Sequence, residues 1–155
     1  LSSIPQIKTH LRLDSIINME NGDVCDAEVL KCQPVIAFCG IANPEGFRQI
    51  LQDVQVQLKM FKAFPDHHEY SLNDIKELES IASQEGVKFI LVSEKDAVKL
   101  KGMKFSLPFF KVVIDLEILE GREIFNKKIF NSKTRRISFS SLLASNIRME
   151  KRYKK

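Results

Sequence analysis

The segment FPDHHEY, at residues 64–70, gathers the side chains best suited to proton transfer. Asp66 stands directly before His67 and His68, two of the three histidines in the chain. A histidine that titrates near neutrality can take a proton from a hydroxyl, and a neighbouring carboxylate fixes its tautomer and stabilises its charged form. The segment therefore predicts a general base supported by an acid.

Two other interpretations of this segment stay open. One imidazole would instead cap the helix expected after Ser71 or bond a backbone carbonyl, as a lone histidine commonly does. Aspartate and histidine are also metal ligands, but adjacent side chains in an extended loop usually diverge, and the remaining histidine is the distant His10. We therefore expect no metal site here.

A second candidate site lies in SEKDAVKL, at residues 93–100. Lys95 is placed to attract a phosphate, and Asp96 to bond a sugar hydroxyl or the backbone of its own motif. The alternative is a capping box between Ser93 and Asp96 with a solvated lysine. A third loop, GIANP at residues 40–44, offers Gly40, which either lets a ligand approach the backbone or simply closes a tight turn.

Four apolar runs predict the strands that must position these loops. They cover residues 34–40, 56–64, 87–93 and 109–118, and the last two are apolar enough for a sheet buried on both faces. Helical patterns lie between them, at residues 43–51 with Asn43 as cap, at 71–86 with a capping box of Ser71 and Asp74, and at 93–100. This alternation predicts an α/β fold, a mostly parallel sheet flanked by helices.

In a parallel sheet the loops that follow the strands gather at one edge, where open α/β sheets bind ligands. The loops GIANP, PDHHEYS and SEKD each follow a predicted strand and lead into a predicted helix. Helix N-termini favour phosphate or carboxylate groups, because their N–H groups are free. We therefore expect these three loops to converge on an edge that binds anions.

The two ends of the chain differ from this central region. Residues 11–30 contain two β-like stretches around Asn21-Gly22, which signal a two-residue hairpin. Residues 127–155 carry ten basic side chains against Glu150 alone, so this tail has a charge of +9 and the rest of the chain −5. We predict a β-ribbon lead-in at 1–33, an α/β domain at 34–125, and a basic tail at 126–155 that binds anionic surfaces or is simply a solvated terminus.

The composition, 44% hydrophobic and 28% charged, is that of a folded soluble domain. The sequence contains neither a run of about 20 apolar residues nor the apolar segment of a secretory signal, so we expect a cytoplasmic location. Cys25, Cys32 and Cys39 form no CxxC pair, which predicts reduced thiols rather than disulfides or a zinc ribbon. The first residue is Leu1 rather than Met, which suggests a processed, trimmed or partial chain.

Taken together and in this order, GIANPEGF, FPDHHEYS and SEKDAVKL resemble the C-terminal domain of tetraacyldisaccharide 4′-kinase, the lipid A kinase of Gram-negative bacteria. The resemblance extends from about Pro34 to Ile118. It implies transfer of the ATP γ-phosphate, with magnesium, to the 4′-hydroxyl of a membrane-borne disaccharide, by two α/β lobes linked by a β-ribbon. It also implies that a histidine of the DHH segment acts as the base with an aspartate of the other lobe. We assign this role to His67 first, with Asp66 and His68 in support.

The chain departs from the family in one large respect. A P-loop kinase holds the ATP phosphates with GxxxxGK[ST], and none of the six glycines here is followed by Lys and then Ser or Thr. The chain is therefore predicted to be a P-loop-kinase-like second lobe, inactive until an ATP-binding N-terminal lobe joins it. Its other expected partners are the lipid A disaccharide precursor and, through the basic tail, the inner-membrane surface, with no nucleic acid.

Two alternatives from other functional classes stay open. In the first, the chain is a relic lobe that only associates with a membrane or a partner through its basic end. In the second, it is a metal-dependent phosphoesterase that uses the DHH segment, although the additional aspartate motifs of such enzymes are missing from the sequence.

Overall fold

The computed structural model describes residues 6–124, which form two compact units. The larger unit is Leu13–Ile114, and the smaller unit combines residues 6–12 with residues 115–124. The smaller unit contains ion pairs from Lys8 to Glu120, at 3.3 Å, and from Arg12 to Asp115, at 3.9 Å. The predicted basic tail at 126–155 lies outside the described residues.

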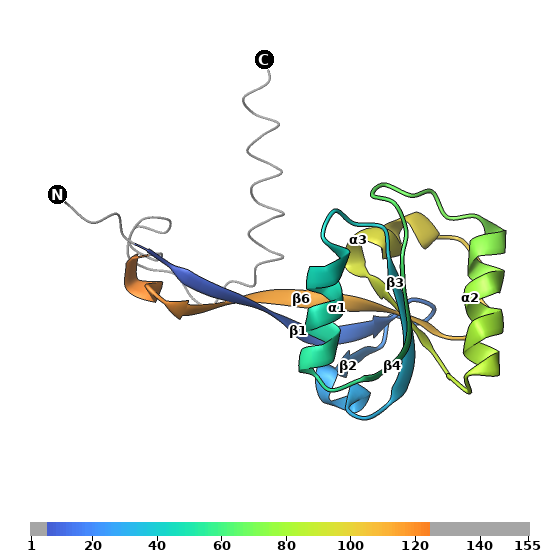
Figure 1. The fold of residues 1–155 in the computed structure, drawn as a ribbon, viewed down its shortest axis with the longest axis horizontal. Coiled ribbons are helices and arrows are strands. Elements are labelled where there is room, and N and C mark those ends of the chain that lie inside the picture. Colours follow the sequence, from blue (N-terminus) through green and yellow to red (C-terminus); the bar gives the residue numbers. More distant parts are fainter. Residues whose placement is uncertain (1–5, 125–155) are drawn as a thin grey trace, which may run out of the picture. The chain divides into compact units, whose positions relative to one another are not determined.

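A six-stranded sheet runs through the described residues, as Figure 1 shows. Its strands lie in the order β2-β1-β6-β5-β3-β4, and β4, β3, β5 and β6 pair in parallel. The strands are β1 (Lys8–Asn18), β2 (Val24–Asp26), β3 (Pro34–Cys39), β4 (Gln57–Ala63), β5 (Ile90–Ser93) and β6 (Phe109–Glu120). The predicted α/β fold with a mostly parallel sheet is confirmed.

The predicted N-terminal hairpin is present, with a longer turn than the sequence signal indicates. β1 and β2 pair antiparallel, with Ser15 opposite Asp26 and Ile17 opposite Val24. The turn closes where the N–H of Asn18 donates to the carbonyl of Asp23 at 2.9 Å, so several residues separate the strands instead of two. Gly22, with φ of +78°, supplies the left-handed conformation that this turn requires.

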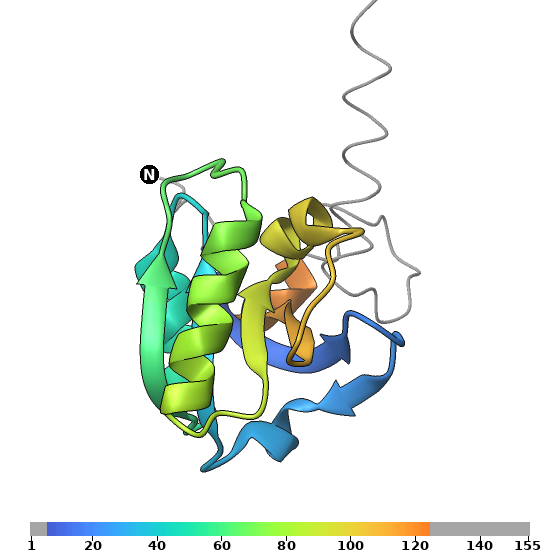
Figure 2. The ribbon, with the colours of Figure 1, turned by 90° about the vertical axis from the view of Figure 1, so that its right-hand side faces the viewer.

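Alternate residues of β3 pack into two cores on opposite faces of the sheet. Ile36 and Phe38 belong to the core that α2 (Leu72–Gln84) covers, whereas Val35, Ala37 and Cys39 belong to the core that α1 (Pro44–Asp53) covers. The two-residue period of a strand produces this alternation. Figures 1 and 2 show α1 and α2 on opposite sides of the sheet.

Side-chain caps fix where the helices begin. The side chain of Asn43 accepts from the N–H of Gly46 at 3.0 Å at the start of α1, with a proline in the first turn. Ser71 and Asp74 form the predicted capping box of α2, and the helix ends just before Gly86, whose φ is +66°. The remaining helices are α3 (Glu94–Ala97) and the 3-10 helices η1 (Ala27–Leu30) and η2 (Val98–Leu100).

The prediction of burial on both faces holds for β5 but is wrong for most of β6. All four residues of β5 are buried, because β5 lies between β3 and β6 and both cores pack against it. In β6 only Phe109 and Val112 are fully buried, and the strand goes on to carry charged residues such as Glu117. No helix within residues 6–124 is both long and apolar enough to cross a membrane.

Candidate functional site

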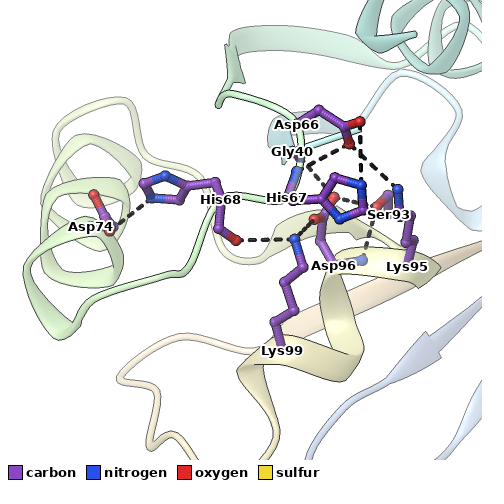
Figure 3. Close-up of polar contacts among 9 residues, drawn as sticks. All are labelled: Gly40, Asp66, His67, His68, Asp74, Ser93, Lys95, Asp96 and Lys99. Carbon is purple, nitrogen blue, oxygen red and sulfur yellow. Dashed lines mark hydrogen bonds and ion pairs between the residues drawn. The ribbon is translucent and has the colours of Figure 1, made fainter. Parts of the chain in front are cut away.

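The three loops that follow β3, β4 and β5 are bonded to one another, as their place in a parallel sheet predicts. The N–H of Gly40 donates to the Asp96 carboxylate at 2.7 Å, and the carbonyl of Gly40 accepts from the N–H of His67 at 3.3 Å. Lys95 Nζ lies 3.4 Å from Asp66 Oδ1. Figure 3 shows this cluster, which places Asp66, His67 and Lys95 at one edge of the sheet.

His67 presents its ring to solvent beside Asp66. Its side chain is 76% exposed, and its Nε2 lies 3.6 Å from Asp66 Oδ2, which is too far for a hydrogen bond. The backbone of His67 is left-handed, with φ of +62°, a conformation that costs a residue other than glycine about 1 kcal/mol. Such strain is found at functional sites more often than elsewhere, where neighbouring contacts hold it in place.

His68 faces the opposite way and anchors the loop to α2 (Figure 3). Its Nε2 lies 3.2 Å from Asp74 Oδ2, so the ring donates to a carboxylate at the helix N-terminus. Its ring also stacks on Phe64, with 4.5 Å between centroids, and meets the edge of Tyr70. The side chain is only 26% exposed. Ser71 rather than a histidine caps α2, and His68 instead supports the capping box through its bond to the Asp74 side chain.

The carboxylate of Asp74 is stabilised in its charged form. The backbone N–H of Ser71 donates to it at 2.8 Å and is the largest cause of its lowered pKa. Burial opposes this as the second-largest effect, and the Ser71 hydroxyl and then His68 lower the pKa further. An ionised Asp74 is a strong acceptor, which holds the His68 ring in one orientation.

Lys95 and Asp96 are neighbours in sequence with opposite environments. Lys95 is 52% exposed and reaches Asp66, so its charge is available at the edge of the sheet. Asp96 has no exposed surface, and its carboxylate accepts from Ser93 Oγ and from the N–H of Gly40. Of the two, Lys95 alone is placed to meet a ligand, whereas Asp96 bonds Ser93 in its own motif and Gly40 in the loop after β3.

Sequence reasoning missed two side chains in this cluster. Lys99 Nζ donates to the carbonyl of His68 at 3.0 Å and to Asp96 Oδ1 at 3.3 Å. The hydroxyl of Tyr70 is buried, without a hydrogen-bond partner among the described residues, and burial followed by the charge of Asp96 raises its pKa. The contact of Lys99 with Asp96 had a signal in the sequence, because residues three apart on a helical turn lie side by side.

Metal-ligating side chains are not clustered among the described residues. Within residues 6–124, no three His, Cys, Asp or Glu side chains lie close enough together to hold a metal ion. Magnesium takes oxygen ligands such as carboxylates, and here Asp66 faces cations while Asp96 is enclosed. We therefore assign no step to a metal held by these residues.

Comparison with known proteins identifies the family. The family model described as tetraacyldisaccharide-1-P 4′-kinase matches residues 2–132 of this chain. The chain belongs to this kinase family. A tetraacyldisaccharide 4′-kinase from Syntrophus aciditrophicus is 32% identical over 105 residues, which cover 67% of this chain and 28% of that protein. One from Rickettsia felis is 30% identical over 128 residues, covering 82% of this chain and 37% of that protein.

A solved structure shares the fold of this member of the kinase family. The "apo" form of LpxK from Aquifex aeolicus, crystallised in complex with ATP, aligns with a TM-score of 0.52 and 24% sequence identity. The alignment covers 80% of this chain and 35% of that one. The chain thus spans about a quarter to two fifths of the length of the kinases that it matches.

The backbone strain at His67 gives a test of the loop geometry. We expect His67→Gly to be more stable than His67→Ala by about 1 kcal/mol, because glycine adopts a left-handed conformation without the steric cost that alanine pays. The matched pair at His68, where φ is not positive, should show the opposite order or no difference. Urea unfolding of the four variants measures both comparisons, and equal stability of the two His67 variants would contradict the left-handed loop.

The capping cluster of α2 predicts a dependence of stability on pH. The pKa of Asp74 is lowered in the folded protein, so the unfolded chain binds the proton more tightly, and the stabilisation is lost as pH falls through the folded pKa. Asp74→Asn should therefore lower the free energy of unfolding more at about pH 6 than at about pH 2.5. Ser71→Ala keeps the backbone hydrogen bond to Asp74 but loses the hydroxyl bond. The pH dependence of its free energy of unfolding should therefore lie between those of the unchanged chain and Asp74→Asn. A loss that is the same at both pH values would count against this account.

Proposed function

We propose that this chain acts as the acceptor-side lobe of a tetraacyldisaccharide 4′-kinase. In this proposal, ATP phosphorylates the 4′-hydroxyl of the lipid A disaccharide precursor, and His67 removes the proton from that hydroxyl. The observation that carries the proposal is the solvent-facing imidazole of His67 beside Asp66, at the carboxyl edge of a parallel sheet in a chain of this kinase family.

The chemistry assigns a role to each exposed group at this edge. The 4′-oxygen attacks the γ-phosphorus of ATP, ADP leaves, and the hydroxyl proton passes to the free ring nitrogen of His67. Asp66, with its carboxylate 3.6 Å from that ring, stabilises the imidazolium that forms. Lys95 attracts the phosphate groups to the same edge, and His68 supports the loop through Asp74.

ATP is held, in this proposal, by a separate lobe. The sequence has no GxxxxGK[ST] motif, and the matched relatives are roughly three times as long as the matched part of this chain. We therefore expect the chain to transfer no phosphate by itself and to become active when an ATP-binding lobe is added. A second aspartate, supplied by that lobe, would complete the base with His67.

Because the acceptor implied by the family is a lipid, we propose that the reaction takes place at the cytoplasmic face of the inner membrane. The ten basic residues in 127–155 would assist by attraction to anionic headgroups, each contributing about 1 kcal/mol close to the surface. The chain would then be a peripheral protein of that membrane.

A reconstitution assay tests the catalytic assignment. The 155-residue chain is mixed with a separately purified ATP-binding lobe of the Syntrophus aciditrophicus relative, [γ-³²P]ATP, Mg²⁺ and tetraacyldisaccharide-1-phosphate. We expect transfer only from the mixture, and a loss of about 10²–10⁴-fold in kcat for His67→Ala, because a general base contributes about that much. His10→Ala, at the exposed third histidine, is the matched control. Equal kcat for His67→Ala and the unchanged chain would remove the assignment.

A binding module without catalysis is the second candidate, and the charge of +9 over residues 127–155 favours it. In that case the chain would sediment with phosphatidylglycerol vesicles, and deletion of residues 127–155 would abolish the binding, because the remaining charge of −5 repels an anionic surface. Binding should also weaken steeply at high salt. Sedimentation that the deletion leaves unchanged would contradict a role for the tail.

A further inference from the structure

Asp96 is the one charged side chain among residues 6–124 that is fully buried, and each of its oxygens has a partner. Oδ2 accepts from the N–H of Gly40 at 2.7 Å and from Ser93 Oγ at 2.5 Å, while Oδ1 lies 3.3 Å from Lys99 Nζ. Gly40 follows β3 and Ser93 ends β5. The carboxylate therefore joins the loops after two neighbouring strands.

Lys99 extends this junction to the third loop. Its side chain is 17% exposed, and its Nζ donates to the carbonyl of His68 at 3.0 Å in addition to its contact with Asp96. The same Nζ lies 5.8 Å from the ring centre of Tyr70, within the range of a cation–π interaction. The pair thus connects the loops after β3, β4 and β5 through a buried carboxylate and a partly buried ammonium group.

Gly40 shows how closely the junction is packed. A Cβ atom at this position would lie 3.0 Å from Tyr70 Oη, 3.1 Å from the carbonyl of Pro65 and 3.3 Å from Asp96 Oδ1. These distances leave too little room for a side chain unless the loop after β4 shifts. Glycine at this position therefore lets Asp96, Tyr70 and the carbonyl of Pro65, just before the DHH segment, all approach the backbone closely.

A buried ion pair is a weak means of stabilising a fold, because apolar side chains of the same volume often do as well or better. Its specific consequence is orientation, since it satisfies defined groups in defined directions. Here those groups lie on both sides of the His67 side chain. The N–H of His67 donates to the carbonyl of Gly40, and the carbonyl of the next residue, His68, accepts from Lys99. The strained backbone of His67 requires such flanking contacts to persist.

We propose that Asp96 and Lys99 are positioning residues, which hold the loop of residues 65–70 so that the His67 ring faces the acceptor hydroxyl. This inference rests on the function proposed above for His67. Neither side chain touches the substrate, and both act through the backbone at Gly40 and His68. The charged form of Asp96 suits this role: burial alone would raise its pKa, but the bonds from Ser93, Gly40 and Lys99 outweigh burial and lower it.

The first test measures the loop in the 155-residue chain itself. Lys99→Met removes the donor to His68, Lys99→Arg keeps a charged donor, and Lys101→Met changes an exposed lysine two positions away. Amide hydrogen exchange at residues 66–70 should become at least tenfold faster in Lys99→Met, while Lys99→Arg restores much of the protection and Lys101→Met leaves it unchanged. Unchanged exchange at His67 and His68 in folded Lys99→Met would overturn the inference.

The second test uses the reconstituted transfer assay. Lys99→Met should lower kcat about 10–100-fold with little change in KM for ATP, and Lys99→Arg should recover most of that loss. A merely structural role would instead lower the folded fraction, which circular dichroism measures, and leave the kcat of the folded molecules unchanged. That result would also overturn the inference.

The two tests separate failure of this inference from failure of the proposed function. If the unchanged chain transfers no phosphate in the mixture, the kinase assignment fails, and the exchange measurement still decides whether the pair holds the loop. If Lys99→Met leaves Asp96 unpaired and the chain unfolds, the double variant Asp96→Asn, Lys99→Met removes both charges and should fold. Faster exchange at residues 66–70 in that folded variant supports the inference, and native exchange there contradicts it.

Discussion

The arrangement of the candidate site depends on the buried carboxylate of Asp96. A parallel sheet brings the ends of its strands to one edge, but it does not determine how the loops beyond them are oriented. Asp96 supplies that orientation, because one carboxylate accepts from the backbone after β3 and from Ser93 at the end of β5. Lys99 adds the loop after β4. The geometry at His67 is thus fixed by a few charge-assisted hydrogen bonds between loops rather than by the sheet alone.

The adjacent histidines illustrate how one segment supports two different roles. His68 is half-buried against Phe64 and bonded to Asp74, so its ring is fixed by packing and by the start of α2. The backbone of His67 is left-handed, and the ring of His67 lies beside Asp66, away from this anchor. The anchored ring and the exposed ring thus belong to adjacent residues within the short segment between β4 and α2.

Local signals and one rule of topology were enough to predict most of the fold. The strand pattern, the Ser71–Asp74 capping box and the turn at Gly86 each depend on neighbouring residues, and the convergence of the three loops follows from parallel pairing. The burial of β6 was misjudged, because it depends on which elements cover each face and an apolar run does not show this. The length of the turn after Asn18 depends similarly on contacts that an Asn-Gly pair does not specify.

The candidate site was less predictable, since its decisive contacts join residues far apart in sequence. Lys99 meets the carbonyl of His68 across 31 positions, and Asp96 meets Gly40 across 56. A backbone carbonyl carries no sequence signature, so a lysine that bonds one looks like any solvated lysine. The left-handed conformation of His67 was equally hidden, because glycine is the residue that normally signals it. Sequence therefore singled out the segment that carries the proposed base, and only the structure distinguished the exposed imidazole from the anchored one.

The exposure of His67 also bears on how the proposed reaction would be organised. A base in contact with water is poorly placed for catalysis, because solvent weakens the electrostatic effect of Asp66 and competes with the acceptor hydroxyl. Fixed loops and an exposed ring suit a surface that is completed when another lobe and the acceptor close over it. Such closure would remove water from the site and strengthen the interaction of His67 with Asp66. On this argument the internal contacts of the chain fix the direction of the imidazole, and closure in the two-lobe kinase would provide the environment in which it acts.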